Sequence, residues 1–321
     1  MSRRPVIIDC DPGQDDAIAL LLALASPDEL DVLGVTTVAG NVPLPLTQRN
    51  ARLVCDLAGR DTTAVFAGCE RPILRPLVTA HEVHGATGID GMTIGDPRTP
   101  LDSRHAVEFI ISALNAAEDA SVTLVLMGPL TNIAMAMIQA PHVLPRIAEI
   151  VLMGGAMREG GNVTPSAEFN IFVDPHAADV VFQCGRPITA IGLDATHQVP
   201  ATKARVERIR ALGGSVAEAV AGMLGFFNRF DMAKYGSEGA PLHDPCTVAY
   251  LLAPELFEGK PCHVAIEATS PLTMGHTAVD FWGVAGRETN ACWIHGVDAD
   301  GFYELLTARL ARFGQAPAAP E

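Results

Sequence analysis

The feature that most constrains the fold is the regular alternation of short apolar runs with longer helical patterns. Runs such as 6–8 and 122–126 are rich in β-branched residues and have the length of buried strands. Between such runs lie segments with helical apolar spacing, including 46–57 and 106–117. Parallel strands need long crossover connections, usually helices, so the pattern predicts an α/β fold with an open, mostly parallel central sheet flanked by helices. The same pattern continues through 32–35, 150–153, 177–182 and 188–191.

The 321 residues are enough for one large α/β domain, and we expect residues 1–313 to form a single one. Segment 203–235 departs from the alternation and predicts a largely helical insertion near the active site. It contains Phe226, Phe227 and Phe230, and it could form a wall over the site or pack in an ordinary way. Residues 314–321 are rich in Ala and Pro, which predicts a disordered tail.

Four carboxylates are crowded between the first predicted strand and the first predicted helix: Asp9, Asp11, Asp15 and Asp16. Asp15 and Asp16 fall in the first helical turn, where the helix dipole favours negative charge. That dipole accounts for one or two acids, but like charges this close raise each other's pKa unless a cation compensates them. The turn therefore predicts a hard divalent cation with oxygen ligands. An acidic N-cap on a surface loop is the alternative, which the apolar flanks disfavour.

Other polar clusters also follow predicted strands, at 37–41, 127–129 and 154–155. In open α/β sheets, ligands bind beyond the carboxyl ends of the strands. We therefore expect these clusters to meet the acidic turn at one edge of the sheet.

Segment 167–170 carries groups suited to sugar hydroxyls. In an extended chain, Glu168 and Asn170 would share one side, with Phe169 opposite, and Asn162 lies shortly before them. Both residue types are also common in loops, so the segment alone is weak support for a sugar site.

Two segments supply histidines. His243 precedes Asp244, which could either cap the next helix or reach the cation of the acidic turn. His243 titrates near neutrality, so it is a candidate proton donor, although it could also only pack. His81 and His84 lie in a glycine-flanked segment predicted as a loop, and the absence of H-E-x-x-H spacing or thiolate pairs disfavours zinc.

Composition limits the partners. Acidic residues number 37 and basic residues 22, and no Lys/Arg-rich run occurs, which disfavours a nucleic acid polymer or an anionic membrane as partner. A small neutral or cationic substrate fits better. The seven cysteines are scattered without a C-x-x-C pair, and no signal-like or membrane-length apolar segment is visible. We expect a cytoplasmic protein with reduced thiols.

An apolar strand ending in D-x-D resembles the start of haloacid dehalogenase-type phosphatases. Those enzymes need a later lysine and a later acidic pair, and none of Lys203, Lys234 and Lys260 has a matching context. Segment 9–17 is a fuller match: it resembles the signature of the inosine-uridine-preferring nucleoside hydrolases almost letter for letter. Further matching blocks follow in order over nearly the whole chain, at 36–41, 84–85, 128–132, 151–155, 167–170 and 243–246.

The resemblance implies a nucleoside hydrolase-like fold, a bound calcium ion (Ca2+), and a homodimer or homotetramer. It implies that Asp11, Asp16, Asp244 and the backbone carbonyl of Met127 bind calcium. Asp11 would also be the general base on the attacking water, which Asn41 would orient.

The same resemblance implies that Asp15, Asn162, Glu168 and Asn170 hold the ribose. His84 and His243 would face the base, with His243 assisting protonation of the leaving group. Asp9 would support the turn. The segment before His243 departs from the family pattern, so base preference and the roles of Phe227, Asp231 and Tyr235 stay open.

The predicted activity is calcium-dependent hydrolysis of the N-glycosidic bond of ribonucleosides through an oxocarbenium-like transition state. The main alternative is a non-catalytic nucleoside- or sugar-binding protein that keeps the metal site. Asp11 disfavours that alternative, because binding alone does not require a general base.

Overall fold

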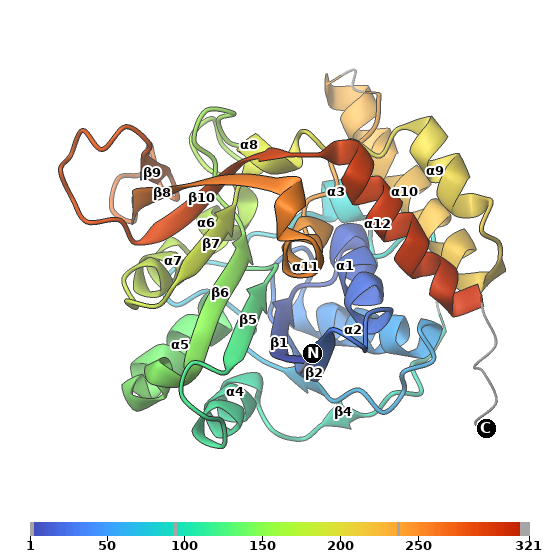
Figure 1. Cartoon of the computed structure of the whole chain (residues 1–321), viewed down its shortest axis with the longest axis horizontal. Helices are drawn as coiled ribbons and strands as arrows, with labels where there is room; N and C mark the ends of the chain where they lie inside the picture. Colours follow the sequence, from blue (N-terminus) through green and yellow to red (C-terminus); the bar gives the residue numbers. More distant parts are fainter. Residues whose placement is uncertain (1–2, 93–94, 236–237, 315–321) are drawn as a thin grey trace.

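A computed structural model describes residues 3–92, 95–235 and 238–314, without the side chains of 230–235. Its centre is a ten-stranded sheet in the order β4-β3-β2-β1-β5-β6-β7-β10-β8-β9 (Figure 1). All neighbours from β4 to β10 are parallel, and only β8 and β9 are antiparallel additions, which confirms the open, mostly parallel sheet. The strands are β1 (Arg4–Cys10), β2 (Leu30–Thr37), β3 (Val65–Ala67), β4 (Leu101–Asp102), β5 (Val122–Leu126), β6 (Ile147–Met153), β7 (Ile188–Ile191), β8 (Phe257–Ile266), β9 (Thr277–Asp280) and β10 (Ala291–Val297).

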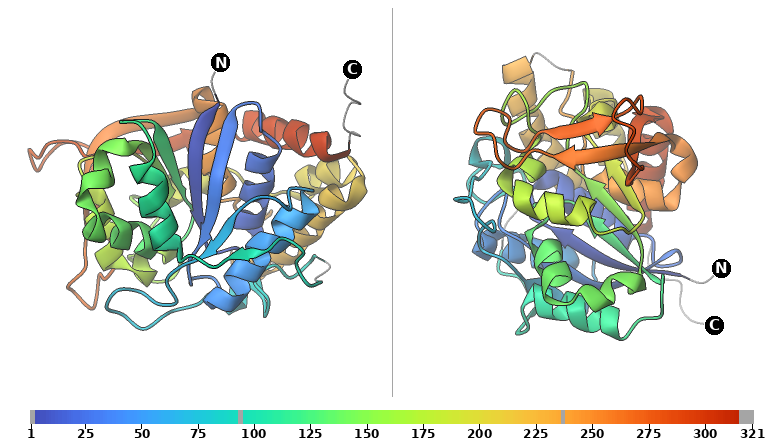
Figure 2. Two further views of the ribbon diagram at one scale, coloured as in Figure 1. Left: turned by 90° about the horizontal axis from the view of Figure 1, so that it is seen from below. Right: turned by 90° about the vertical axis from the view of Figure 1, so that its left-hand side faces the viewer.

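Helices cover both faces of the sheet (Figure 2). Apolar side chains from α1, α2 and α9 to α12 pack on one face, and those from α4, α5 and α7 pack on the other. The helices are α1 (Gln14–Leu24), α2 (Leu44–Leu57), α3 (His81–His84), α4 (Ala106–Asn115), α5 (Thr131–Gln139), α6 (Phe169–Val173), α7 (Pro175–Phe182), α8 (Leu193–Thr196), α9 (Lys203–Arg210), α10 (Gly214–Tyr235), α11 (Pro245–Leu252) and α12 (Ala299–Leu310).

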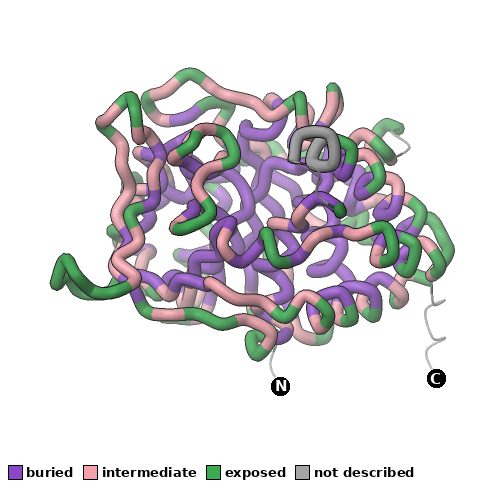
Figure 3. The backbone as a smooth tube through the Cα atoms, turned by 90° about the horizontal axis from the view of Figure 1, so that it is seen from above, coloured by how far each residue is buried: buried purple, intermediate pink, exposed green. Residues whose placement is uncertain are grey.

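The central strands are buried on both faces, which explains why they read as continuous apolar runs. Along β1, Ile8 joins the core on one face and Ile7 the core on the other, and Val125 and Leu124 of β5 divide in the same way. Figure 3 shows this buried centre beneath an exposed outer layer. Within the described ranges, no helix combines the length and apolar character needed to cross a membrane.

Most predicted elements are confirmed, with shifts at their ends. The strands predicted at 122–126 and 188–191 coincide with β5 and β7, while the helix predicted from residue 46 begins at Leu44 behind Pro43. The predicted helical insertion consists of α9 and α10. Of the predicted tail, Gly314 ends a 3-10 turn and 315–321 lie outside the described residues.

The strand order places a reversal in the middle of the sheet. From β1 the chain moves outward through β2, β3 and β4, and then returns to β5 on the other side of β1. Connections therefore leave β1 and β5 in opposite directions, and ligands of open α/β sheets bind at such a switch point, beyond the carboxyl ends of the strands. The acidic turn lies at this point.

Candidate functional site

The turn between β1 and α1 is closed by one of its own carboxylates. Asp16 accepts hydrogen bonds from the backbone N–H groups of Gly13 (2.9 Å) and Asp11 (3.1 Å). Gly13 is the N-cap of α1, so Asp15 and Asp16 lie in its first turn, as predicted. Asn41 joins this turn, donating its N–H to Asp11 Oδ2 (2.6 Å) and its Nδ2 to Asp16 Oδ2 (3.2 Å).

Three buried carboxylates form a candidate metal centre. Oxygens of Asp15, Asp16 and Asp244 lie within 4.8 Å of one another. Asp244 stands at the start of α11 but makes no capping hydrogen bond, so the cap interpretation fails and its side chain faces the other two acids. Asp11 lies beside this group rather than within it.

One carboxylate oxygen of this centre and one beside it lack partners. Asp11 Oδ1 and Asp15 Oδ1 are buried without a hydrogen bond from any described residue. Burial, and then the charge of Asp16, raise the pKa of Asp15 to about 7 and the pKa of Asp11 well above its usual range. Burial and Asp15 raise the pKa of Asp244 in the same direction. Unpaired, oxygen-only donors of this kind fit a hard divalent cation.

Two glycines leave room for the Asp11 carboxylate. A Cβ at Gly40 would lie 2.0 Å from Asp11 Oδ2, and one at Gly128 would lie 2.6 Å from Asp11 Oδ1. Both glycines follow strands that neighbour β1, so the strand ends enclose this side chain closely.

Asp9, near the end of β1, bonds this strand to neighbouring segments. Its Oδ1 accepts from Thr36 Oγ1 (2.5 Å) and Asn132 Nδ2 (2.8 Å), and burial raises its pKa to about 7 despite these bonds. Its backbone carbonyl accepts the N–H of Met127 (2.8 Å), which ties β1 to the end of β5. Thr36 and Asn132 were not singled out from the sequence, although both lie in blocks that carry the family resemblance.

The predicted extended segment 167–170 ends at Glu168, because α6 begins at Phe169, so the predicted alternation of Glu168, Phe169 and Asn170 is wrong. Glu168 is the N-cap of α6, and its carboxylate accepts from the backbone N–H groups of Asn170 and Ile171, which the helix start leaves unpaired. It also accepts from the N–H of Gly155, after β6. Burial nevertheless raises the pKa of Glu168 to about 7.

From within α6, Asn170 points toward the carboxyl ends of β5 and β6. Its Nδ2 donates to the carbonyls of Met127 (3.0 Å) and Met153 (3.2 Å), so it holds the carbonyl that the resemblance assigned to the metal. Asn162 is exposed, and its Oδ1 accepts from the N–H of Phe169 (3.0 Å). This places Asn162 in the loop over α6, bonded to backbone rather than to the acids.

The two histidines implied to face the base are both neutral at physiological pH. Burial, followed by the neighbouring histidines, lowers the pKa of His84 and of His243 to about 3. His243 Nδ1 lies 2.8 Å from Thr196 Oγ1, and His84 Nδ1 lies 2.7 Å from Gln14 Oε1. Neither Thr196 nor Gln14 was predicted from the sequence as a partner of these rings. Thr196 is a polar residue that follows a strand, and this position could have identified it.

His84 belongs to the one-turn helix α3 rather than to a loop, which corrects that prediction. Its ring stacks on Phe227 of α10, with centroids 5.6 Å apart, so the insertion does pack against the site. The side chains of Phe230, Asp231 and Tyr235 lie outside the described residues.

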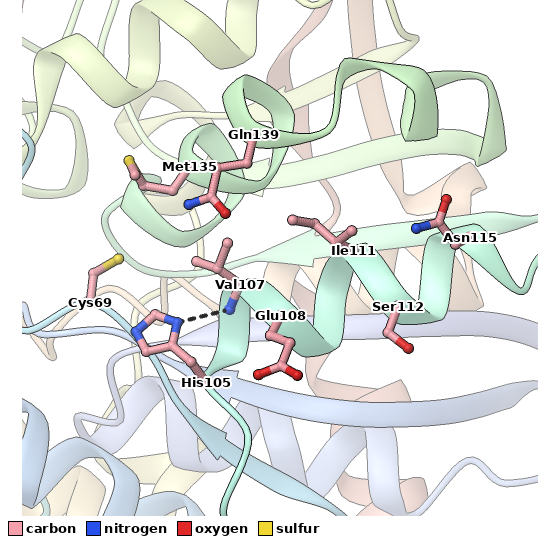
Figure 4. A pocket seen from close by; sticks show the side chains of 9 residues that line it. All are labelled: Cys69, His105, Val107, Glu108, Ile111, Ser112, Asn115, Met135 and Gln139. Atoms are coloured by element: carbon pink, nitrogen blue, oxygen red, sulfur yellow. Dashed lines mark hydrogen bonds between the residues drawn. The ribbon is translucent and has the colours of Figure 1, made fainter.

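A surface groove lies apart from these groups, between α4 and α5 (Figure 4). None of its residues is a predicted site residue: Cys69, His105, Val107, Glu108, Ile111, Ser112, Asn115, Met135 and Gln139 line it.

Comparisons with known proteins find similar sequences over nearly the whole chain. The sequence model described as inosine-uridine preferring nucleoside hydrolase matches residues 6–304. An uncharacterized protein of Schizosaccharomyces pombe is 49% identical over 307 residues, covering 96% of this chain and 99% of that protein. The pyrimidine-specific ribonucleoside hydrolase RihA of Shewanella sp. (strain MR-7) is 49% identical over 309 residues, covering 96% of each chain.

Among solved structures, the purine-preferring ribonucleoside hydrolase from Gardnerella vaginalis aligns with a TM-score of 0.90 at 32% identity, covering 97% of this chain and 99% of that one. The family match spans the acidic turn, α6 and Asp244 alike. The chain therefore belongs to the inosine-uridine preferring nucleoside hydrolase family and is an N-glycosyl hydrolase acting on ribonucleosides.

Proposed function

We propose that the protein releases ribose and free base from ribonucleosides in a calcium-dependent reaction, with pyrimidine ribonucleosides preferred. The observation that carries the metal dependence is the buried group of Asp15, Asp16 and Asp244, with unpaired oxygens on Asp11 and Asp15. The available donors are carboxylate and carbonyl oxygens, without a thiolate or imidazole in the group, which favours a hard cation over zinc. Among hard cations, calcium is chosen because the family resemblance implies it.

When bound, the cation would supply positive charge that lowers the pKa of the attacking water and attracts ribose hydroxyls. Asp16, Asp244, Asp11 and the carbonyl of Met127 are the proposed ligands. Asp15 belongs to the same carboxylate group, and its unpaired oxygen is available to a ribose hydroxyl as well.

Asp11 is the proposed general base. Asn41 holds its Oδ2, which leaves Oδ1 free to accept a proton from water. Asn41 also donates to Asp16, so it fixes both carboxylates and helps to orient the nucleophile.

The ribose would bind between Asp15 and the α6 segment, with Glu168, Asn170 and Asn162 contributing. Glu168 is fixed by three backbone donors, so its lone pairs are held in place for sugar hydroxyls. Negative and dipolar groups around the ring stabilise the positive charge that develops as the base departs.

On the base side, His243 is neutral in the free enzyme and would assist the leaving group by hydrogen bonding. The pyrimidine preference rests on relatives, because RihA is 49% identical whereas the purine-preferring structure is 32% identical. The free cysteines fit a reducing compartment such as the cytoplasm, and a homodimer or homotetramer remains our expectation.

The test measures reducing-sugar release from uridine, cytidine, inosine and adenosine, before and after chelation and after return of Ca2+, Mg2+ or Zn2+. We expect chelation to abolish release and calcium to restore it, with uridine and cytidine the better substrates. Asp11→Ala should lower kcat by about 10²- to 10⁴-fold, the usual contribution of general base catalysis.

Asp298→Ala is the matched control, because Asp298 caps α12 and lies outside the carboxylate group. It should lower stability by about 1 kcal/mol without changing kcat. Full activity in the chelated protein would contradict the metal proposal, and full activity of Asp11→Ala would contradict the role of Asp11.

A further inference from the structure

Gln14, the first residue of α1, joins the acidic turn to the segment that carries His84. Its side chain is fully buried and makes three contacts there. Nε2 donates to the backbone carbonyls of His84 (3.0 Å) and Asp90 (3.2 Å), while Oε1 lies 2.7 Å from His84 Nδ1.

These contacts determine which way the Gln14 amide faces. Backbone carbonyls can only accept hydrogen bonds, so the NH₂ group must point at the carbonyls of His84 and Asp90. The amide oxygen then faces His84 Nδ1, and because that oxygen also only accepts, Nδ1 must carry a proton. The opposite amide orientation would set the amide oxygen against both carbonyl oxygens.

His84 has only one ring proton. It is 6% exposed, and burial lowers its pKa to about 3, so the ring is neutral. A proton on Nδ1 therefore leaves a lone pair on Nε2, which no described residue contacts by a hydrogen bond. The ring is also held in position, since a Cβ on Gly13 would lie 2.3 Å from Nδ1 and Phe227 stacks on it.

We propose that Gln14 is a positioning residue that keeps His84 as the Nδ1–H tautomer, so that Nε2 accepts a hydrogen bond from an N–H group of the nucleobase. The inference rests on the proposed function of the site. The N3–H of uracil and the 4-amino group of cytosine are suitable donors. His84 then recognises the base and cannot donate a proton to it, which leaves that task to another group such as His243.

The direct test is the tautomer itself. In histidine-labelled protein, ¹⁵N NMR with His84→Asn as the assignment variant should show a protonated Nδ1 and an unprotonated Nε2 at His84 in the otherwise unaltered enzyme. Gln14→Met keeps the side-chain length but removes the acceptor, so the ring should shift toward the Nε2–H form. A proton on Nε2 of His84 in the enzyme with Gln14 intact would overturn the inference, whether or not Gln14→Met folds.

Kinetics separate this inference from the proposed function. The ribosides compared are uridine and 4-nitrophenyl riboside, whose leaving group has no N–H. We expect Gln14→Met to raise KM for uridine about 10-fold more than for the nitrophenyl riboside, the order expected for one lost hydrogen bond. If the native enzyme cleaves neither, the proposed function fails; if Gln14→Met affects both equally, only the present inference fails.

Asn50→Leu is the matched control. Asn50 Nδ2 donates to the carbonyls of Pro12 (3.0 Å) and Thr87 (2.8 Å), so it joins the same two segments without touching the His84 ring. This variant should show no selective loss on uridine. The Gln14→Met, His84→Asn double variant should lose no more on uridine than His84→Asn alone, because Gln14 acts through that ring. A selective loss in Asn50→Leu, or additive losses in the double variant, would overturn the inference.

Discussion

The acids of the β1–α1 turn and the acids beside α6 are buried alike but bonded differently. Asp11 and Asp15 are 0% and 5% exposed, and Glu168 and Asp174 are 2% and 0% exposed. Both oxygens of Asp174 accept hydrogen bonds, from the N–H groups of Ile73 and Ala177 and from a threonine hydroxyl, as both oxygens of Glu168 do from backbone. Asp11 and Asp15 each keep one buried oxygen without a partner.

This difference separates Glu168 and Asp174, whose oxygens are all bonded to neighbouring groups of the fold, from Asp11 and Asp15, each of which has an oxygen left for a ligand. A buried carboxylate bonded to backbone N–H groups satisfies donors that would otherwise be unpaired. A buried carboxylate with an unpaired oxygen costs free energy in the empty protein, and a cation or hydroxyl offsets that cost. Burial alone does not distinguish the two.

The largest effects are expected when one aspartate of each region is replaced by asparagine. Asp15→Asn should lower kcat/KM for uridine by about 10²- to 10³-fold, because it removes negative charge from the proposed ribose site. The metal-free protein should be no less stable, since repulsion with Asp16 and Asp244 is relieved. Reducing-sugar assays and urea unfolding in chelator give both quantities.

Asp174→Asn should instead lower the stability of the protein and leave its catalysis nearly unchanged. An amide cannot accept hydrogen bonds with both of its ends, so a buried donor is left unpaired at a cost of about 1–3 kcal/mol in unfolding free energy. Its kcat/KM per folded molecule should stay near that of the unaltered enzyme. Equal stability losses in the two variants would remove the distinction between the regions.

A smaller effect is expected from crowding each region with one methyl group. Gly40→Ala would place a Cβ 2.0 Å from Asp11 Oδ2, so the carboxylate must move, and kcat should fall by about 10²-fold, as expected for an ångström-scale displacement. Gly154→Ala meets Ile171 Cδ1 at 3.2 Å, where a flexible chain end can yield. Steady-state kinetics should therefore show little change in Gly154→Ala, and a similar loss in both would contradict the close enclosure of Asp11.

The smallest effect concerns pH. Burial raises the folded-state pKa of Asp9 and of Asp15 from 3.8 to about 7. Between these values the folded state binds more protons than the unfolded state, so the metal-free protein should lose stability as pH rises from about 4 to about 7. Urea midpoints at about pH 5 and about pH 8 in chelator should show this fall, and saturating calcium should diminish it. Equal or rising midpoints in chelator would contradict it.

The sequence was most informative where the signal is local. The β-branched run at 122–126 and the first helical turn at Asp15 and Asp16 need only neighbours in the chain, and both predictions are confirmed. The extended form of 167–170 was wrong because α6 begins at Phe169, directly after the cap residue Glu168, and no apolar period distinguishes a five-residue helix from a loop. That residues 1–313 form one domain stays a prediction.

By itself, the sequence determined the sheet type, the position of the acidic turn and the family, because short-range patterns and a nearly unbroken motif specify them. Only the tertiary structure decided which acids meet and which remain unpaired. Asp244 reaches Asp15 and Asp16 because α11 packs against α1, and Gln14 meets His84 because α3 is folded back over the turn. Hydrogen-bond partners distant in the chain carry no local signal, so their pairing appears only when packing brings them together.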